Sequence, residues 1–359
     1  MCASEISMKP SPLTPQHRSA GTSLESALGT ELVKDFGDVR GEYDALRDGA
    51  GLLDLAFLRA VQISGADTAD YLHRRLSNSV KSLAVGGGCH TGLLRPDGTM
   101  IAEMTVHRTG EAAFLALVPA LAEDALIESL EKFIFSEECA VSRTEASVLG
   151  LVGPESAKMI ETALGVGVDR LAEWGIAAGT DGLSVARLQV SLQPAFALVG
   201  IDPARRWSAL TAAGARPCGM GAFHVHRIEA GLPLFGVDHD DSWMPADAGL
   251  ESIVDFEKGC FPGQEAVAKA HNVGHPRHVL RGFTFEASAP PAPGTPFFLE
   301  KSELGSVTSV CESPALGRPI GLGHLKWKWR EETGALQLGH EGTLGTAHPV
   351  ALPFDVSSR

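Results

Sequence analysis

The chain has 359 residues, of which 44% are hydrophobic and 21% charged, and its formal net charge is −14. This length is typical of two domains or three small ones, and this composition excludes a largely disordered chain. An acidic surface repels phosphate backbones, and no block of five basic residues offsets it, so we expect no stable nucleic-acid binding.

The N-terminal segment, the hydropathy and the cysteines indicate where the chain works. Residues 1–23 are rich in Ser, Thr and Pro and lack the apolar region of a secretory signal, so we expect a disordered tail. No stretch reaches 18 uninterrupted apolar residues, which argues against a membrane span. Cysteines at positions 2, 89, 139, 218, 260 and 311 form neither a CxxC pair nor a zinc-finger spacing. Reduced thiols in a cytoplasmic protein are expected.

Four strand–turn–helix units form two pairs that resemble each other: 61–76 with 149–164, and 116–130 with 197–210. In the last unit, Asp202 is the expected N-cap and Pro203 the first helical residue. The repetition is too sparse for a solenoid. It predicts two similar α+β lobes, each with strands covered on one side by helices.

Residues 221–231 read as a short helix with Glu229 near its C-terminal end, where the helix dipole disfavours a carboxylate. Glu229 therefore needs another partner. One interpretation pairs it with Arg227 or a distant lysine. The other directs it into a pocket, where it accepts N–H groups of a heterocyclic ligand. The DHDD segment at 238–241 lacks the pattern of a calcium loop and is expected to be a solvated turn.

The octapeptide KGCFPGQE, residues 258–265, is the most unusual segment of the chain. Its two glycines and its proline predict a bend that exposes Cys260. The neighbouring Lys258 would favour the thiolate, the reactive form of cysteine. Gln264 and Glu265 follow at the start of a predicted helix. The structural alternative is a tight turn with a half-buried cysteine.

After residue 275 the pattern changes to short alternating strands separated by Gly and Pro, with a Pro-rich connector at 288–296. We expect a small antiparallel β-barrel or sandwich over 276–359, preceded by the two lobes over 24–275. In HLKWKWR, residues 324–330, aromatic and basic residues alternate, as in a barrel strand with Trp inward and Lys outward. A surface that stacks nucleic-acid bases would show the same alternation.

Three histidines near the boundary, His271, His275 and His278, raise the question of a metal site. His271 and His275 are four residues apart, but Gly274 and Pro276 end any helix there. Solvated histidines in a turn are the favoured interpretation, and no metal site is expected.

Two segments resemble a known protein family: 217–236 (PCGMGAFHVHRIEAGLPLFG) and 244–269 (MPADAGLESIVDFEKGCFPGQEAVAK). They are similar to the YgfZ-type folate-binding proteins, relatives of the glycine-cleavage T-protein, an aminomethyltransferase. Residues 43–80 and 91–106 are similar to both groups, and KGCFPGQE points to the YgfZ branch. The resemblance implies a cloverleaf fold: two related α+β lobes and a C-terminal antiparallel β-barrel around a folate channel.

The resemblance also implies a ligand and its contacts. Tetrahydrofolate is the expected cofactor, and Glu229 matches the pterin-contacting glutamate of the family. We place Arg227, Gln264 and Lys258 with it among the expected folate-binding residues.

Two departures bear on the chemistry. T-proteins carry Gly-Gly-[IV]-[IL]-Asp-Asp, whose first aspartate promotes methylene transfer. Here GTMIAE puts Ala102 at that position and Glu103 at the next. Neighbouring side chains in a strand point to opposite faces, so Glu103 is not expected to replace a carboxylate at 102. The Gly-Tyr-Thr-Gly-Glu loop of T-proteins is also absent, and residues 188–200 occupy that region.

The expected function is therefore tetrahydrofolate binding without T-protein chemistry. The resemblance implies support for the assembly or repair of iron–sulfur enzymes, including tRNA-modifying ones, with Cys260 as the functional thiol and iron–sulfur proteins as partners. The alternative is a folate-dependent aminomethyl- or methyltransferase, or a demethylase, in which another residue assists transfer.

Overall fold

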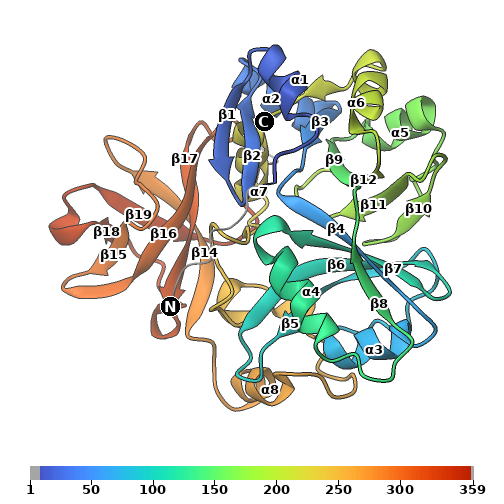
Figure 1. The fold of residues 1–359 in the computed structure, drawn as a ribbon. Helices are drawn as coiled ribbons and strands as arrows, with labels where there is room; N and C mark the ends of the chain where they lie inside the picture. The colour runs from blue at the N-terminus through green and yellow to red at the C-terminus, as the bar shows by residue number, and fades with distance from the viewer. Residues whose placement is uncertain (1–8, 357–359) are drawn as a thin grey trace.

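The computed structural model describes residues 9–356, which form two α+β lobes and a β-barrel (Figure 1). This is the fold class that the sequence predicts. Among these residues no helix is long and apolar enough to cross a membrane.

The first lobe contains a five-stranded antiparallel sheet in the order β5-β6-β7-β4-β8. Its strands are β4 (Leu58–Ser64), β5 (Gly88–Leu94), β6 (Met100–Gly110), β7 (Ala113–Pro119) and β8 (Ala140–Arg143). Two helices, α3 (Thr68–Arg75) and α4 (Glu123–Glu131), bury Leu72, Leu126 and Leu130 against one face of this sheet. That face is apolar because alternate side chains of each strand point toward the helices.

The second lobe repeats this plan. Its sheet has the order β10-β11-β12-β9-β3-β13, of which the first four strands match β5-β6-β7-β4 of the first lobe. The strands are β3 (Gly51–Asp54), β9 (Ser147–Val152), β10 (Ile176–Ala178), β11 (Ser184–Leu188), β12 (Ala195–Gly200) and β13 (Arg216–Pro217). Helices α5 (Ser156–Leu164) and α6 (Pro203–Ala212) cover one face, and the Asp202 carboxylate caps α6 as predicted.

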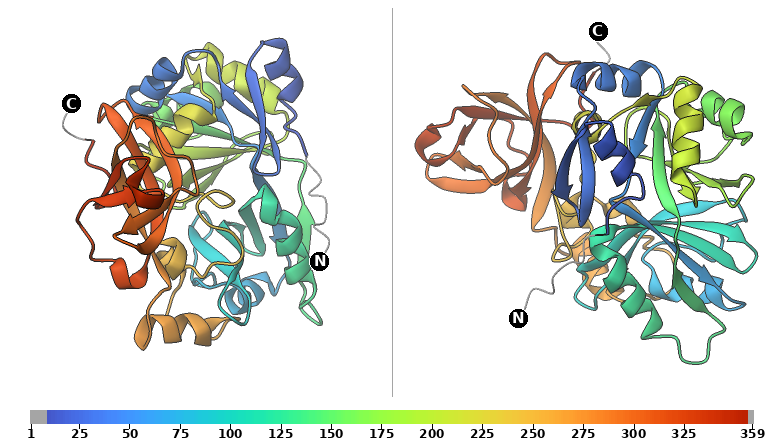
Figure 2. Two further views of the ribbon diagram at one scale, coloured as in Figure 1. Left: turned by 90° about the vertical axis from the view of Figure 1, so that its left-hand side faces the viewer. Right: turned by 45° about the horizontal axis from the view of Figure 1, so that its top comes forward.

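Helices α2 (Val39–Asp48) and α7 (Met220–Glu229) cover the other face of the second sheet. The barrel packs against α7 through two of its strands. Helix α7 therefore lies between the second lobe and the barrel (Figure 1), and the right-hand view of Figure 2 shows these two parts on either side of the molecule.

The N-terminal residues are more ordered than the sequence suggests. Helix α1 (Thr14–Ser19) precedes a separate two-stranded sheet of β1 (Ser23–Ala27) and β2 (Thr30–Asp35). Leu13 is fully buried, and His17 is buried between Phe36 and Trp207. These contacts contradict the expected disordered tail over residues 9–23, because a segment that buries apolar side chains is held in place. Residues 1–8 of that tail lie outside the described range.

The C-terminal part is a closed antiparallel barrel in the order β14-β17-β16-β15-β18-β19. Its strands are β14 (His278–Glu286), β15 (Pro296–Leu299), β16 (Ser302–Ser313), β17 (Arg318–Lys326), β18 (Leu336–Leu338) and β19 (Thr346–Val350). Strand β17 ends at Lys326, and Trp327–Trp329 form a 3-10 turn. The predicted strand alternation over 324–330 is therefore wrong beyond Lys326.

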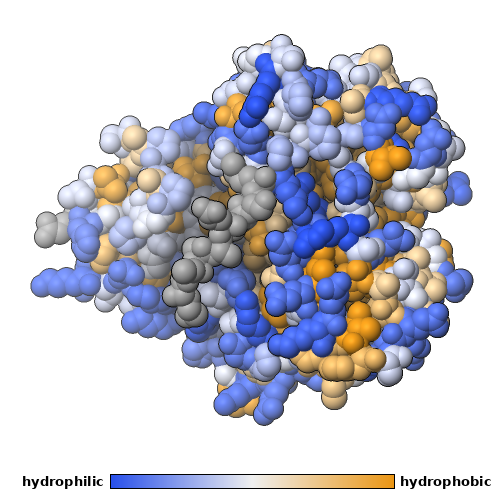
Figure 3. All heavy atoms as spheres, viewed as in Figure 1, coloured by the Kyte–Doolittle hydropathy of each residue, from blue (hydrophilic) through white to orange (hydrophobic). Residues whose placement is uncertain are grey.

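The octapeptide lies in the connection between the lobes and the barrel, where it leads into α8 (Gln264–Asn272). Most of the face seen in Figure 3 is hydrophilic, in keeping with the acidic composition, and apolar side chains show mainly over the lobe that carries α4.

Candidate functional site

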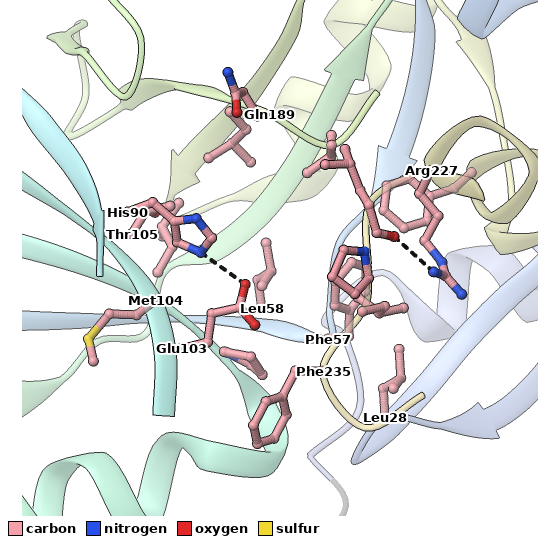
Figure 4. Close-up of a pocket in the computed structure, with 18 of the residues that line it drawn as sticks. Leu28, Phe57, Leu58, His90, Glu103, Met104, Thr105, Gln189, Arg227 and Phe235 are labelled. Carbon is pink, nitrogen blue, oxygen red and sulfur yellow. Dashed lines mark hydrogen bonds and ion pairs between the residues drawn. The ribbon is translucent and has the colours of Figure 1, made fainter. Parts of the chain in front are cut away.

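A pocket of about 840 Å³, partly open to solvent, lies between the two lobes and α7 (Figure 4). Six separate parts of the chain supply its walls: the tip of the β1–β2 hairpin, the start of β4 with the residue before it, strands β5 to β7 with the turn that follows, the segment around residue 174, the end of β11 with the loop that follows, and α7 with the residues that follow it. Small molecules bind preferentially in pockets of this kind, between domains and with mainly apolar walls. The two lobes thus create one shared site.

A carboxylate projects from the first lobe into this pocket. Glu103 of β6 accepts hydrogen bonds at both oxygens: Oε1 lies 2.9 Å from Nε2 of His90, and Oε2 lies 2.8 Å from Nε2 of His239. Burial alone would raise the pKa of Glu103, but the hydrogen bonds from His239 and His90 outweigh it and hold that pKa well below the usual range. Glu103 is therefore an anion at neutral pH.

Ala102 and Glu103 lie on opposite faces of β6, as the strand alternation predicts. Ala102 is fully buried in the core of the first lobe, whereas Glu103 lines the pocket. The sequence interpretation took position 102 as the one that faces the ligand. The structure shows that position 103 faces the pocket, which therefore keeps a carboxylate that the sequence analysis considered lost.

Aromatic and aliphatic side chains form most of the remaining wall: Leu28, Phe57, Leu117, Leu121, Trp174, Leu188, Val190, Phe223, Leu234 and Phe235. Trp174 has a left-handed backbone (φ 59°), which is rare for a bulky residue. Its carbonyl accepts a hydrogen bond from Nδ1 of His107 at 2.8 Å, and its ring centroid lies 5.1 Å from that of His90. Strain of this kind is often kept at functional sites.

Arg227 is the one predicted binding residue that lines the pocket. Its guanidinium is buried and bonds to Asp238 Oδ2 at 2.7 Å, to Ser309 Oγ at 2.6 Å and to the Leu232 carbonyl at 3.0 Å. Asp238 therefore neutralises its charge. The residue forms part of the wall and joins α7 to barrel strand β16.

The DHDD turn differs from the prediction. Asp238 and His239 are buried, where they hold Arg227 and Glu103, while Asp240 and Asp241 are exposed. The expected solvated turn is thus wrong for its first half. The reason is tertiary: the turn is covered by the barrel, whose Thr308 and Ser309 hydroxyls also bond Asp238.

Glu229 lies outside the residues that line the pocket. Its carboxylate is buried between α2, α7 and β16, where it accepts hydrogen bonds from the Tyr43 hydroxyl at 3.1 Å and the Ser313 hydroxyl. Burial raises the pKa of Glu229, and these two hydrogen bonds act in the opposite direction. The carboxylate thus bonds to two hydroxyl groups rather than to Arg227 or a lysine, and it does not line this pocket.

The octapeptide occupies a different place from the pocket. Lys258 Nζ donates to the carbonyls of His73, Leu76 and Asn78, at 2.5, 2.6 and 3.2 Å, at the C-terminal end of α3. Burial lowers the pKa of Lys258 to about 8. Cys260, two residues along, is exposed, and Gln264 is half-buried as the first residue of α8. The octapeptide is thus anchored by its lysine.

The three boundary histidines do not share one turn, as the sequence suggests: His271 lies in α8, His278 begins β14, and His275 lies in the connection between them. His271 pairs with Glu251 at 2.7 Å and stacks on Phe256. Within residues 9–356, no cluster of three or more His, Cys, Asp or Glu residues is arranged to hold a metal ion.

Sequence reasoning missed Glu103, His90, His239 and Gln189 as pocket or supporting residues. For Glu103 a signal exists: Met100, Ala102 and Met104 alternate as the apolar face of β6, which leaves position 103 on the other face. His239 comes from a loop, and no periodic pattern marks it.

Comparison with known proteins agrees with this architecture. The GCVT N-terminal domain matches residues 13–174 and 202–258, and the glycine cleavage T-protein C-terminal barrel domain matches residues 278–355. An aminomethyltransferase of Streptomyces avermitilis is 31% identical over 94% of this chain and 95% of that protein.

Two further matches extend this result. An aminomethyltransferase of Halothermothrix orenii is 28% identical over 97% of this chain and all of that protein. The crystal structure of glycine cleavage system aminomethyltransferase T from Bartonella henselae superposes with a TM-score of 0.90 at 24% identity, and covers 97% of this chain and 98% of that one. The chain belongs to the glycine cleavage T-protein family.

Proposed function

We propose that this chain binds tetrahydrofolate in the pocket between its lobes, with Glu103 as the group that recognises the pterin. The observation that carries the proposal is an ionised carboxylate on the wall of an otherwise largely apolar pocket. A pterin is a flat heterocycle with N–H donors on its edge. Apolar walls can cover its faces while a carboxylate accepts its N–H groups.

Calorimetric titration with tetrahydrofolate under anaerobic, reducing conditions tests this assignment. We expect saturable binding by the wild type and a loss of affinity of about tenfold or more in Glu103→Gln, because a hydrogen bond to a charged group is lost. Glu257→Gln, an exposed glutamate, is the matched control. Glu229→Gln tests the carboxylate that the resemblance favours. Loss of binding in Glu229→Gln but not in Glu103→Gln would place the ligand elsewhere.

We further propose that the chain supports the assembly or repair of iron–sulfur enzymes, including tRNA-modifying ones, through Cys260. This role follows from the KGCFPGQE resemblance. It is supported by an exposed thiol on a segment that Lys258 ties to α3, so that a partner protein can reach it. One thiol cannot hold a cluster alone, so contact with a cluster would be transient and shared.

A deletion strain separates this role from folate binding. Wild type should restore the activity of iron–sulfur enzymes, and Cys260→Ala should not, although it should bind tetrahydrofolate normally. Cys139→Ala, at a half-buried thiol, is the control. Equal rescue by Cys260→Ala and wild type would make Cys260 structural.

A second function, folate-dependent one-carbon transfer, is favoured by one observation: Glu103 faces the pocket. The argument against this chemistry assumed that the pocket had lost its carboxylate. If the chain has this activity, purified protein should transfer one-carbon units from aminomethylated or methylated donors to tetrahydrofolate. Glu103→Gln would lower the rate about 10²- to 10⁴-fold. Absence of turnover with retained binding would leave the assembly role.

A further inference from the structure

The DHDD turn brings a buried histidine against the pocket carboxylate. We propose that His239 is a positioning residue that keeps Glu103 ionised and directed into the pocket, so that the site accepts the N–H-bearing end of a ligand and rejects a carboxylate there. The choice of ligand end rests on the proposed folate binding; the role of His239 in holding Glu103 does not.

The two histidines that bond Glu103 differ in access. The side chain of His90 is 20% exposed and lines the pocket, whereas that of His239 is fully buried and lies behind the wall. Each imidazole occupies one carboxylate oxygen, at 2.9 and 2.8 Å. A ligand can therefore displace or rearrange the hydrogen bond of His90, while that of His239 stays in place.

The backbone around His239 is held from both sides. The His239 carbonyl accepts a hydrogen bond from the Gly236 amide at 2.7 Å, and the imidazole packs edge-on against Phe235, with ring centroids 5.5 Å apart. The preceding residue, Asp238, is held by Arg227 and by two barrel hydroxyls. The imidazole has little freedom, which is the property required of a group that orients another.

The hydrogen-bond pattern assigns the tautomer of His239. Its Nδ1 is buried and has no hydrogen-bond partner among residues 9–356, while Nε2 faces a carboxylate oxygen. A proton on Nε2 satisfies Glu103, whereas a proton on Nδ1 would be a buried donor without an acceptor. Nε2 of His239 therefore carries the proton that is donated to Glu103.

The other charged and titratable groups nearby leave this arrangement intact. Arg227 lines the same pocket but is paired with Asp238. His107, on the Glu103 face of β6, bonds Thr105 and the Trp174 carbonyl, and burial lowers its pKa to about 4. Burial likewise lowers the pKa of His324, which lies near His239, to about 4. The inner end of the pocket is therefore negative, and N–H groups or an amine suit it.

An NMR titration of ligand-free protein, labelled with ¹³C at glutamate carboxyls, tests the role of His239 directly. In the wild type, the Glu103 signal should remain that of an anion from pH 8 to about 4. In His239→Leu, the Glu103 carboxyl should titrate at a pH about one unit or more above that in the wild type. His239→Gln, whose amide can replace the Nε2 donor, should restore the wild-type behaviour, and His239→Asn, whose amide is too short, should not. Identical titration of Glu103 in wild type and His239→Asn would overturn the proposal.

The second arm measures affinity for tetrahydrofolate in the same variants. We expect His239→Leu to lower it about 10-fold or more and His239→Gln to restore it. Normal binding by all variants would overturn the positioning role while leaving the proposed function standing. If the wild type binds no folate, the proposed function fails, and the NMR titration still decides whether His239 holds Glu103.

Discussion

His90 and Glu103 are diagonal neighbours on one face of the first sheet. The register of β5 with β6 pairs His90 with Thr105 and Gly92 with Glu103, and the imidazole reaches two residues along to place Nε2 2.9 Å from the carboxylate. Diagonal pairs on one face of a sheet are within reach of such long side chains. The contact therefore follows from strand register.

This pair makes the contribution of Glu103 to stability depend on pH. The pKa of Glu103 is lowered from its ordinary value of 4.5, so its stabilising effect is present above that value and is lost as pH falls through the lower, folded-state pKa. The difference in free energy of unfolding between wild type and Glu103→Gln should be constant from pH 7 to about 5 and shrink below that. Urea unfolding at several pH values measures it. A difference that grows on acidification would contradict the assignment.

Buried histidines should make the whole chain sensitive to mild acid. Burial lowers the pKa values of His107, His226 and His324 to about 4 from an ordinary 6.5. The unfolded chain therefore takes up protons below pH 6.5 that the folded chain excludes, and stability falls from there to pH 4. Each of these histidines should lower the free energy of unfolding by about 3 kcal/mol between pH 6.5 and pH 4.

His324 offers a specific check, because neither of its ring nitrogens has a partner among the described residues. His324→Leu should unfold with an unchanged or about 1 kcal/mol higher free energy at pH 7, because it removes an unsatisfied polar group. Between pH 6.5 and pH 4, the free energy of unfolding of this variant should fall less steeply than that of the wild type. His275→Leu, at an exposed position, is the control. A steeper acid dependence in His324→Leu would be evidence against the buried neutral state.

Thiol accessibility should single out Cys260. Among the cysteines of residues 9–356 it is the exposed one, and burial raises the pKa values of Cys89 and Cys218 to about 12. In a Cys2→Ser background, native protein at pH 8 should show one fast-reacting thiol with an aromatic disulfide reagent, because thiolate fraction and access control the rate. Cys260→Ala should abolish it. Two or more fast-reacting thiols would contradict the assignment of Cys260 as the exposed thiol of the described residues.

Gly263 should be the sensitive glycine of the octapeptide. Its φ is +80°, and a Cβ would lie 2.5 Å from the Arg95 carbonyl oxygen. Gly263→Ala should therefore lower the free energy of unfolding by about 1–3 kcal/mol. A Cβ on Gly259 would meet nothing within 4 Å, so Gly259→Ala is the matched control and should be near neutral. Denaturant unfolding compares the two, and equal stabilities would show that the turn adjusts.

Local patterns in the sequence predicted the parts of the fold that local patterns control. Contacts between neighbours along the chain determine the N-cap at Asp202, the repeated strand–turn–helix units and the short alternating strands after residue 275. The strand–turn–helix units of each lobe followed from them. The resemblance to T-proteins added the assembly of the three parts.

The site was less predictable because contacts distant in sequence decide it. The unfavourable position of Glu229 at a helix end was recognised, but its partners Tyr43 and Ser313 lie 186 and 84 residues away. Strand alternation placed Ala102 and Glu103 on opposite faces, yet alternation alone does not say which face meets the pocket. That depends on α3 and α4 covering one side of the sheet.

Arg227 belongs to the pocket wall and, through Ser309, to the barrel. Local opening that separates the barrel from the lobes must break this hydrogen bond and expose the ion pair with Asp238. A ligand that packs against Arg227 therefore adds its binding free energy to the cost of that opening. Amide hydrogen exchange in β16 should slow when the pocket is saturated, although no ligand atom touches the strand.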